Sequence, residues 1–319
     1  MTTEKTGTDI RKRRDKMSKG RRRSRRQSYD LNKYILCALV FFAICGTIFC
    51  MVVNARENSI ENKMVLIRQE MSALSKTTDN VVAQAAEEIR TSRDRNFAVQ
   101  PGVPAGTEEE PEGEKVVYLT FDDGPSENTK RIIDILAQYD AKATFFVTGA
   151  NEECRHYIKE AYDAGHTIGL HTYSHEYPDV YASDEAYFAD LAKVGEVVKE
   201  QIGYVPCFIR FPGGSSNMVS AKYSDGIMTR LVTAVQEQGY QYYDWNLDTG
   251  DAAGCGKEEI EANSTTEKLS HVMLLCHDTQ AKDATVEALP YILEYYTNLG
   301  YKFKAIDRNS IVCHHGVQN

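Results

Sequence analysis

The chain has 319 residues, of which 42% are hydrophobic and 26% are charged, a balance typical of globular rather than disordered proteins. Residues 1–33 hold thirteen Lys/Arg against four Asp/Glu, and residues 34–54 hold no charge. The whole chain carries −9, so residues 55–319 carry a net −18. A basic head and an acidic body separated by an apolar run indicate a membrane between them, and this argues against nucleic acid as the partner of the head.

Residues 34–54 are predicted to form a transmembrane signal anchor in contact with membrane lipid. The run from Tyr34 to Val53 is twenty uncharged residues long, which matches a helix that crosses a bilayer. A cleaved signal peptide is the alternative, but its apolar region is typically shorter, and no Ala-x-Ala-like site follows. The basic residues 1–33 form a cytoplasmic tail by the positive-inside rule. We therefore expect a single-pass protein of the cell membrane with an extracellular body.

Residues 55–95 lack Gly and Pro and are predicted to form a helical stalk. Apolar residues recur there at spacings of three and four, at Ile60, Met64, Ile67, Met71, Leu74, Val81 and Ala85. Because the repeats are few, a single helix and a coiled-coil homodimer both remain open. Residues 96–114 are rich in Pro, Gly and Glu and are interpreted as a flexible linker.

Five cysteines lie beyond the predicted anchor, and their spacing does not pair them as disulfides. Cys207 and Cys276 fall in or beside strand-like runs and are expected to be small buried hydrophobic residues. The full set is Cys154, Cys207, Cys255, Cys276 and Cys313.

Residues 115–319 alternate strand-like and helix-like runs, which predicts parallel strands with helical crossovers. The strand-like runs are 116–121, 143–149, 166–173, 207–211, 240–247, 271–276 and 301–306. Seven strands over about 190 residues favour a distorted barrel related to the eight-unit form. An open doubly wound sheet is the alternative from the pattern alone.

Polar residues close most of these runs, where reactive side chains gather in parallel α/β proteins. The third, fourth and sixth runs end in HTYSH, RFPGG and His277-Asp278, and the fifth offers Asp244, Asp248 and Asp251. His171 and His175 are four residues apart, so on a helix or tight turn both rings can hold one metal ion. A nearby carboxylate would complete a 2-His-1-carboxylate set with open positions.

The first run ends in the doublet Asp122-Asp123, and adjacent residues of a strand point in opposite directions. One carboxylate can therefore bind a metal while the other faces the attacking water. Asp-Gly-Pro is also good turn chemistry, and read alone the doublet would only begin a turn. Together with the other strand ends, it predicts one ligand and one general base.

Five motifs together resemble the polysaccharide deacetylases, the NodB-homology domains of carbohydrate esterase family 4. They are TFDDGPSENT (120–129), HTYSH (171–175), RFPGG (210–214), DWNLDTGD (244–251) and LLCHD (274–278). The resemblance covers roughly Val116 to Asp307. It implies a distorted (β/α)7-type barrel and a metal-dependent hydrolase that acts on carbon–nitrogen bonds other than peptide bonds in linear amides.

The resemblance also implies a role for each matching residue. Asp122 would be the general base, held by Arg210. Asp123, His171 and His175 would bind the metal, usually Zn²⁺, with Co²⁺, Mn²⁺ or Ni²⁺ as alternatives.

On the other flank of the bond to be cut, the resemblance implies that His277 is the general acid and that Asp248 orients it. The backbone N–H of Gly213 would hold the oxyanion, and Leu275 would line the pocket for the acetyl methyl group.

Two positions depart from the family pattern and bear on substrate preference. Gly213 stands where Tyr is common, so a side-chain contact to the sugar is lost while the backbone donor remains. Ala252 stands where Trp often follows the aspartate, so one wall of the acetyl pocket is missing or supplied elsewhere. Trp245 is interpreted as a core residue.

These features predict a membrane-tethered deacetylase of a cell-wall polysaccharide, with N-acetylglucosamine of peptidoglycan as the expected sugar. N-acetylmuramic acid, another extracellular polysaccharide or an O-acetyl ester are alternatives within the class. A non-catalytic glycan-binding module and a membrane scaffold driven by the stalk are alternatives from other classes. A silent module would need broken ligands, and all the residues named above are present.

Overall fold

The computed structural model describes residues 71–78, 81–82, 84, 88, 91–94, 96–109 and 113–319. They belong to two units, residues 1–85 and 86–319, and each is described by itself. The predicted cytoplasmic tail, the predicted anchor at 34–54 and the first part of the predicted stalk lie outside the described residues. Within the described part, no helix is both long and apolar enough to cross a membrane.

Residues 71–78, which lie within the predicted stalk, are helical. Met71 and Leu74, two members of its predicted apolar seam, are 60% and 58% exposed. A homodimer through this seam therefore stays a prediction, with exposed apolar side chains available for it.

Residues 96–109 are fixed to the second unit, so the expectation of a flexible linker over 96–114 is wrong for this part. The Val99 N–H donates to the Val205 carbonyl at 2.8 Å, and the Cys207 N–H donates to the Phe97 carbonyl at 2.8 Å. The Arg308 guanidinium donates to four further backbone carbonyls, those of Asn96, Ala98, Val103 and Pro104. Residues 96–109 therefore form an ordered segment, here called the strap, rather than a flexible linker. Its backbone carbonyls accept hydrogen bonds from Arg308, about 200 residues later in the sequence.

Every strand pair of the second unit is parallel, as the alternating pattern predicts. The strands are β1 (Val116–Asp122), β2 (Ala143–Val147), β3 (Thr167–Leu170), β4 (Phe208–Ile209), β5 (Gln241–Tyr242), β6 (Leu247–Asp248), β7 (His271–His277) and β8 (Lys302–Phe303). Their order is β5-β4-β3-β2-β1-β7-β6, and β8 pairs with the start of β1.

This is the circular order of a barrel, but the path ends at β5 and β6, so the curled sheet stays open between them. The expected single strand over 240–247 is divided into these two strands. The chain leaves β5 because the Asp244 carbonyl turns to accept a hydrogen bond from Arg210 at 2.8 Å. It rejoins the sheet at Asn246, whose side chain accepts from the Met273 N–H at 2.8 Å.

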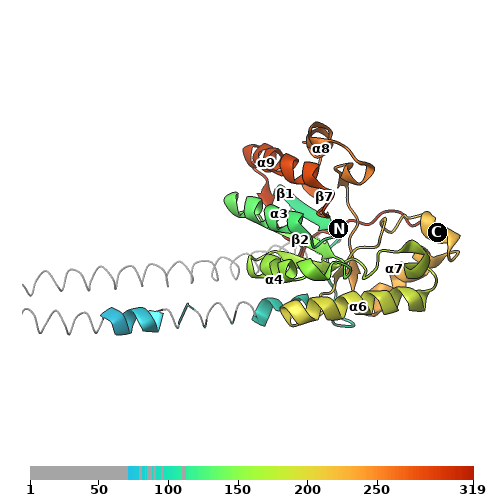
Figure 1. The fold of residues 1–319 in the computed structure, drawn as a ribbon, viewed down its shortest axis with the longest axis horizontal. Helices are drawn as coiled ribbons and strands as arrows, with labels where there is room; N and C mark the ends of the chain where they lie inside the picture. Colours follow the sequence, from blue (N-terminus) through green and yellow to red (C-terminus); the bar gives the residue numbers. More distant parts are fainter. Residues whose placement is uncertain are drawn as a thin grey trace, which may run out of the picture. The chain divides into compact units, whose positions relative to one another are not determined.

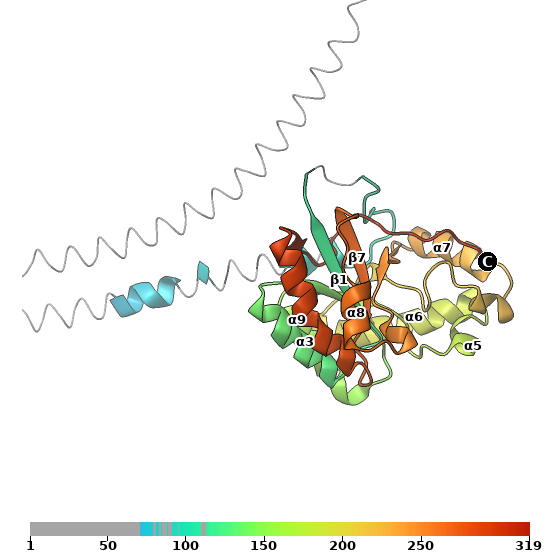
Figure 2. The ribbon, with the colours of Figure 1, turned by 90° about the horizontal axis from the view of Figure 1, so that it is seen from above.

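Helices connect the strands and cover the outer face of the sheet (Figure 1). They are α3 (Glu127–Gln138), α4 (His156–Asp163), α5 (Tyr177–Val180), α6 (Asp184–Ile202), α7 (Ile227–Glu237), α8 (Lys257–Asn263) and α9 (Asp283–Asn298). Short 3₁₀ turns form η1 (Glu152–Cys154), η2 (Val219–Lys222) and η3 (Asp251–Ala253). Helices α3 and α9 lie side by side next to β1 and β7 (Figure 2). The sequence did not predict α8, because its stretch is polar and buries only Ile260.

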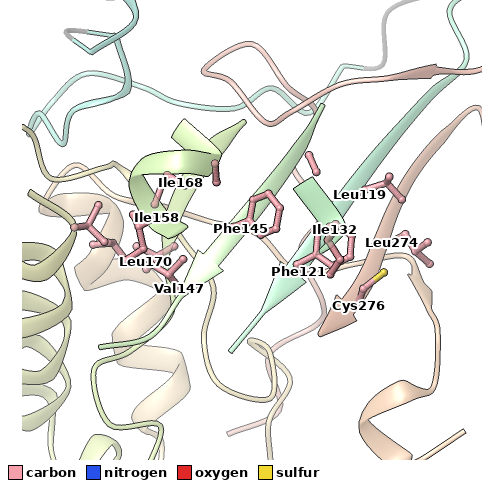
Figure 3. Packing of buried hydrophobic residues seen from close by; sticks show 14 of the residues in the cluster. Leu119, Phe121, Ile132, Phe145, Val147, Ile158, Ile168, Leu170, Leu274 and Cys276 are labelled. Atoms are coloured by element: carbon pink, nitrogen blue, oxygen red, sulfur yellow. The ribbon is translucent and has the colours of Figure 1, made fainter. Parts of the chain in front are cut away.

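Successive side chains of β1 point to opposite faces of the sheet, which divides the core into two clusters and decides which way Asp122 points. Leu119 and Phe121 pack on the helix side, where the Phe121 and Phe145 rings stack at 5.2 Å beside Ile132 (Figure 3). Tyr118 packs on the opposite, inner side. Because successive side chains alternate, Asp122 also points to the inner side. The strand thus delivers a carboxylate into the curl of the sheet.

The Arg308 contacts give a stability prediction. Arg308→Ala removes four charge-assisted donors, so we expect the free energy of unfolding to fall by about 1–3 kcal/mol and the amide of Val99 to exchange faster with solvent. Thermal melts and hydrogen exchange measure these effects. Lys159→Ala is the matched control, because Lys159 makes only an exposed ion pair with Asp163. Equal losses in the two variants would contradict the assigned role of Arg308.

Candidate active site

Asp122 lies at the end of β1, 3% exposed, and pairs with the guanidinium of Arg210 at the end of β4. The distance from Arg210 Nη1 to Asp122 Oδ1 is 2.9 Å. Asp122 Oδ2 has no hydrogen-bond partner among the described residues. The expected pairing of Asp122 with Arg210 is therefore present, and it leaves one carboxylate oxygen available to a ligand.

Arg210 is fully buried, and each nitrogen of its guanidinium donates a hydrogen bond. Nη1 also donates to the Thr120 hydroxyl at 2.7 Å, and Nε donates to the Tyr243 carbonyl at 2.8 Å. The guanidinium carbon lies 4.4 Å from the centre of the Phe146 ring. A buried cation with this many partners has one available orientation, which fixes Asp122 in turn.

Asp123, His171 and His175 converge on one point. Asp123 Oδ1 lies 3.4 Å from Nε2 of His171 and 3.4 Å from Nε2 of His175. One ligand atom from each residue lies within 4.8 Å of the others. The structure therefore brings together the three residues expected to bind the metal.

The two imidazoles reach this point from a loop rather than from a helix. The His171 ring is oriented by a 2.7 Å hydrogen bond between its Nδ1 and the Arg210 carbonyl, so Nε2 faces Asp123. His175 has φ of +57° and Asp123 has φ of +71°, which side-chain-bearing residues rarely adopt. The buried Asp190 carboxylate of α6 accepts from the N–H of Tyr173 at 2.5 Å and holds the loop between the histidines.

The donor set fits a divalent cation. Asp123 Oδ1 is buried and has no hydrogen-bond partner within the part of the chain that the structure describes, which is costly for a carboxylate unless a cation approaches it. Burial lowers the pKa of His171 against the opposing charges of Asp122 and Asp123, so the ring is neutral at pH 7, as a ligand must be. Two imidazoles and one carboxylate suit Zn²⁺ and leave coordination positions open.

His277 ends β7 and is oriented by Asp251, not by Asp248 as expected from the resemblance. His277 Nδ1 lies 2.7 Å from Asp251 Oδ1, and the His277 N–H donates to Asp251 Oδ2 at 2.8 Å. Asp248 is exposed and accepts from the Gly250 N–H at 2.7 Å, which stabilises its own turn. The physical reason is the positive φ of Gly250, which turns the chain so that η3 presents the later aspartate to β7.

Both oxygens of the Asp251 carboxylate accept hydrogen bonds, which fixes Asp251 as the partner of His277. Thr285 Oγ1 of α9 donates to Asp251 Oδ2 at 2.7 Å. Burial opposes the charged forms of both partners, but their hydrogen bond outweighs it. The pKa of Asp251 is lowered, and the pKa of His277 is raised to about 9. His277 is therefore a cation at pH 7 in the metal-free chain.

The two residues expected to contact substrate also border this site. Leu275 lies two residues before His277 on β7, so both side chains leave the same face of the strand. Gly213 is exposed, has φ of +76°, and its N–H has no acceptor among the described residues. Its turn is held by Asp244, whose carboxylate accepts from the Ser215 N–H at 2.8 Å.

Two residues, Asp190 and Asp278, support the site in ways that were not predicted from the sequence. Asp190 lies on the amphipathic helix α6. The only sequence feature that could have indicated its role is a carboxylate on the apolar, buried face of this helix. Asp278 is 1% exposed, and burial raises its pKa to about 7 with help from the charges of Asp123 and Asp122. Its Oδ2 accepts from Thr129 Oγ1 at 2.5 Å, which ties the site to the start of α3.

Comparisons with known proteins agree with this geometry. The family profile described as polysaccharide deacetylase matches residues 109–241. Two peptidoglycan-N-acetylglucosamine deacetylases of Bacillus cereus are 33% and 34% identical, over 61% and 63% of this chain and 71% and 90% of their own lengths.

Among solved structures, the catalytic domain of peptidoglycan N-acetylglucosamine deacetylase from Eubacterium rectale is 39% identical with a TM-score of 0.64. The match covers 67% of this chain and 99% of that chain. The chain belongs to the polysaccharide deacetylase family, carbohydrate esterase family 4.

The His277–Asp251 pair gives a pH prediction for the metal-free chain, because a bound cation would lower the pKa of His277. We expect His277 to titrate near pH 9 by NMR. Asp251→Asn should lower this pKa by roughly one unit or more, whereas Asp248→Asn, the matched control, should leave it unchanged.

The same pair contributes to folding stability with a defined sign. The folded pKa of His277 lies above the ordinary 6.5, so the contribution of this histidine is fully present below pH 6.5, while Asp251 stays charged, and is lost as pH rises through about 9. An equal response of His277 to the two aspartate substitutions would contradict the pairing.

Proposed function

We propose that this polysaccharide deacetylase removes N-acetyl groups from N-acetylglucosamine of peptidoglycan, and that it is metal-dependent. The single observation that carries the proposal is the convergence of Asp123, His171 and His175 on one point. Asp122, paired with Arg210, directly precedes Asp123 at the end of β1, and His277, paired with Asp251, ends the neighbouring strand β7. Amide hydrolysis needs a base and an acid placed in this way.

Asp122 is the general base in this proposal. Its Oδ1 is held by Arg210, so Oδ2 is directed to take a proton from the attacking water. When bound, a divalent cation supplies polarisation of the acetyl carbonyl and lowers the pKa of water. The ion pair with Arg210 keeps the Asp122 carboxylate in one orientation throughout this transfer.

His277 is the general acid. Nδ1 is occupied by Asp251, so Nε2 is the ring atom that can give a proton to the departing amine. An amine leaves poorly unless protonated, and the hydrogen bond to Asp251 favours the protonated form of His277 that provides this proton. The exposed Gly213 N–H donates to the developing oxyanion, and Leu275 faces the acetyl methyl group.

The choice of substrate rests on relatives rather than on a sugar-specific contact. Three relatives described above are named as peptidoglycan N-acetylglucosamine deacetylases. Each deacetylation exposes an amine and adds positive charge to the wall.

The proposed reaction predicts that Asp122→Asn strongly reduces acetate release while metal stays bound. The amide keeps an oxygen for Arg210 but accepts no proton, so we expect a fall of about 10²–10⁴-fold in kcat. Acetate is measured on defined peptidoglycan and chitin oligomers with the full chain in detergent, with and without chelator. Asp134→Asn is the control, because Asp134 is exposed and pairs only with Lys130.

Two results would contradict the proposal. Acetate release that persists after chelation and metal removal would exclude the metal role. Glycan binding without acetate release from any N- or O-acetylated substrate would favour a non-catalytic binding module.

We further propose that residues 34–54 anchor the chain in the cell membrane with the deacetylase outside. The absence of charge over this run and the basic residues before it support the proposal. A variant lacking 34–54 should move from the membrane to the soluble fraction, whereas deletion of 1–20 should not release it. Retention of the first variant in the membrane fraction would argue against the anchor.

A further inference from the structure

The Tyr177 hydroxyl lies against the α-carbon of Gly213. A Cβ added at residue 213 would come 2.5 Å from this oxygen, closer than side chains tolerate, and 3.3 Å from the next nearest atoms, those of Asn217. Tyr177 therefore occupies the space that any side chain at residue 213 would need. The positive φ of Gly213 is a separate constraint on the same residue.

The Tyr177 ring is held firmly while its hydroxyl is left free. It packs edge-on against the His175 ring with 5.8 Å between centroids and against the Tyr181 ring with 5.4 Å between centroids. Tyr181 is buried and donates its own hydroxyl to the Pro212 carbonyl at 2.8 Å. The Tyr177 hydroxyl has no hydrogen-bond partner among the described residues. The Tyr177 ring therefore packs against His175 while its hydroxyl, a hydrogen-bond donor, lies next to the turn at Gly213.

We propose that Tyr177 is a substrate-contacting residue whose hydroxyl donates a hydrogen bond to an oxygen of the acetyl group beside the Gly213 N–H. The inference rests on the proposed function for the identity of that group. The Gly213 N–H and the Tyr177 hydroxyl are neighbouring donors, neither of which has an acceptor among the residues that the structure describes. Paired donors of this kind stabilise an oxyanion. Residue 213 is glycine because Tyr177 supplies the side chain for this part of the site.

A double-substitution cycle tests the steric part without metal or substrate. Gly213→Ala, Tyr177→Phe and the double variant are melted as metal-free full chains in detergent. Backbone strain at residue 213 is the same in both backgrounds and cancels. We expect Gly213→Ala to lower the Tm by roughly 4 °C more when Tyr177 is present than after Tyr177→Phe. Equal Tm losses would overturn the claim that Tyr177 excludes a side chain there.

Acetate binding and kinetics test the hydrogen bond. In the zinc-loaded full chain, Tyr177→Phe should weaken acetate binding and lower kcat/KM, each by about 10–100-fold, with unchanged zinc affinity. Tyr173→Phe is the matched control from the loop just before α5, because its hydroxyl already has a partner, with Arg155 Nη2 at 3.4 Å. A purely structural role for Tyr177 would change zinc affinity or the Tm and leave acetate affinity unaltered.

The outcomes separate this inference from the proposed function. If the unsubstituted chain releases acetate and Tyr177→Phe retains kcat/KM and acetate affinity within twofold, the role of Tyr177 is wrong and the function stands. If the unsubstituted chain releases no acetate, the proposed function fails. In that case the acetate affinities of the Tyr177 and Tyr173 variants still decide whether the hydroxyl contacts a carboxylate-sized ligand.

Discussion

The buried guanidinium of Arg210 is the interaction on which the site depends. A cation with no solvent exposure is stable only with a charged partner and filled hydrogen bonds, and Asp122, Thr120 and two carbonyls supply them. Its own carbonyl in turn orients His171. One residue therefore fixes the base and one metal-site ring together, and the geometry of both depends on β4 lying in register beside β3. Removing the Asp122 charge affects folding as well as chemistry, because it leaves this cation without a counterion.

Much of the fold could be predicted because strand and helix periods are local properties of the sequence. The parallel strands and the helices α3, α6, α7 and α9 follow from runs that are apolar at the right spacing. The division of 240–247 into β5 and β6 could not be predicted, because Asp244 and Asn246 bind Arg210 and β7 across the fold. The strap at 96–109 was misread for the same reason: its order comes from Arg308, which composition does not connect to it.

Site residues at strand ends could be predicted, because the topology of the sheet determines their position. The residue that orients His277 could not be predicted, because a turn decides which of several nearby aspartates reaches it. Asp122, Asp123 and His277 end strands, so the topology alone brings them to one edge. The partner of His277 lies in a loop with three aspartates, and only the turn at Gly250 decides that Asp251 reaches the ring. Asp190 was missed because a buried carboxylate on a helix looks like a surface residue until the loop it holds is known.

The expected metal ligands Asp123 and His175 have unfavourable local conformations, so residues outside the ligand set must hold them in place. Asp123 and His175 both hold positive φ angles, each costing on the order of 1–3 kcal/mol, and Asp123 Oδ1 is buried without a hydrogen bond. Three features oppose relaxation of this arrangement: the Asp190 contacts to the loop, the Arg210 carbonyl on His171, and the Thr129 contact to Asp278. A divalent cation would relieve the unpaired oxygen but not the backbone strain. The loop therefore has to be held by the fold itself.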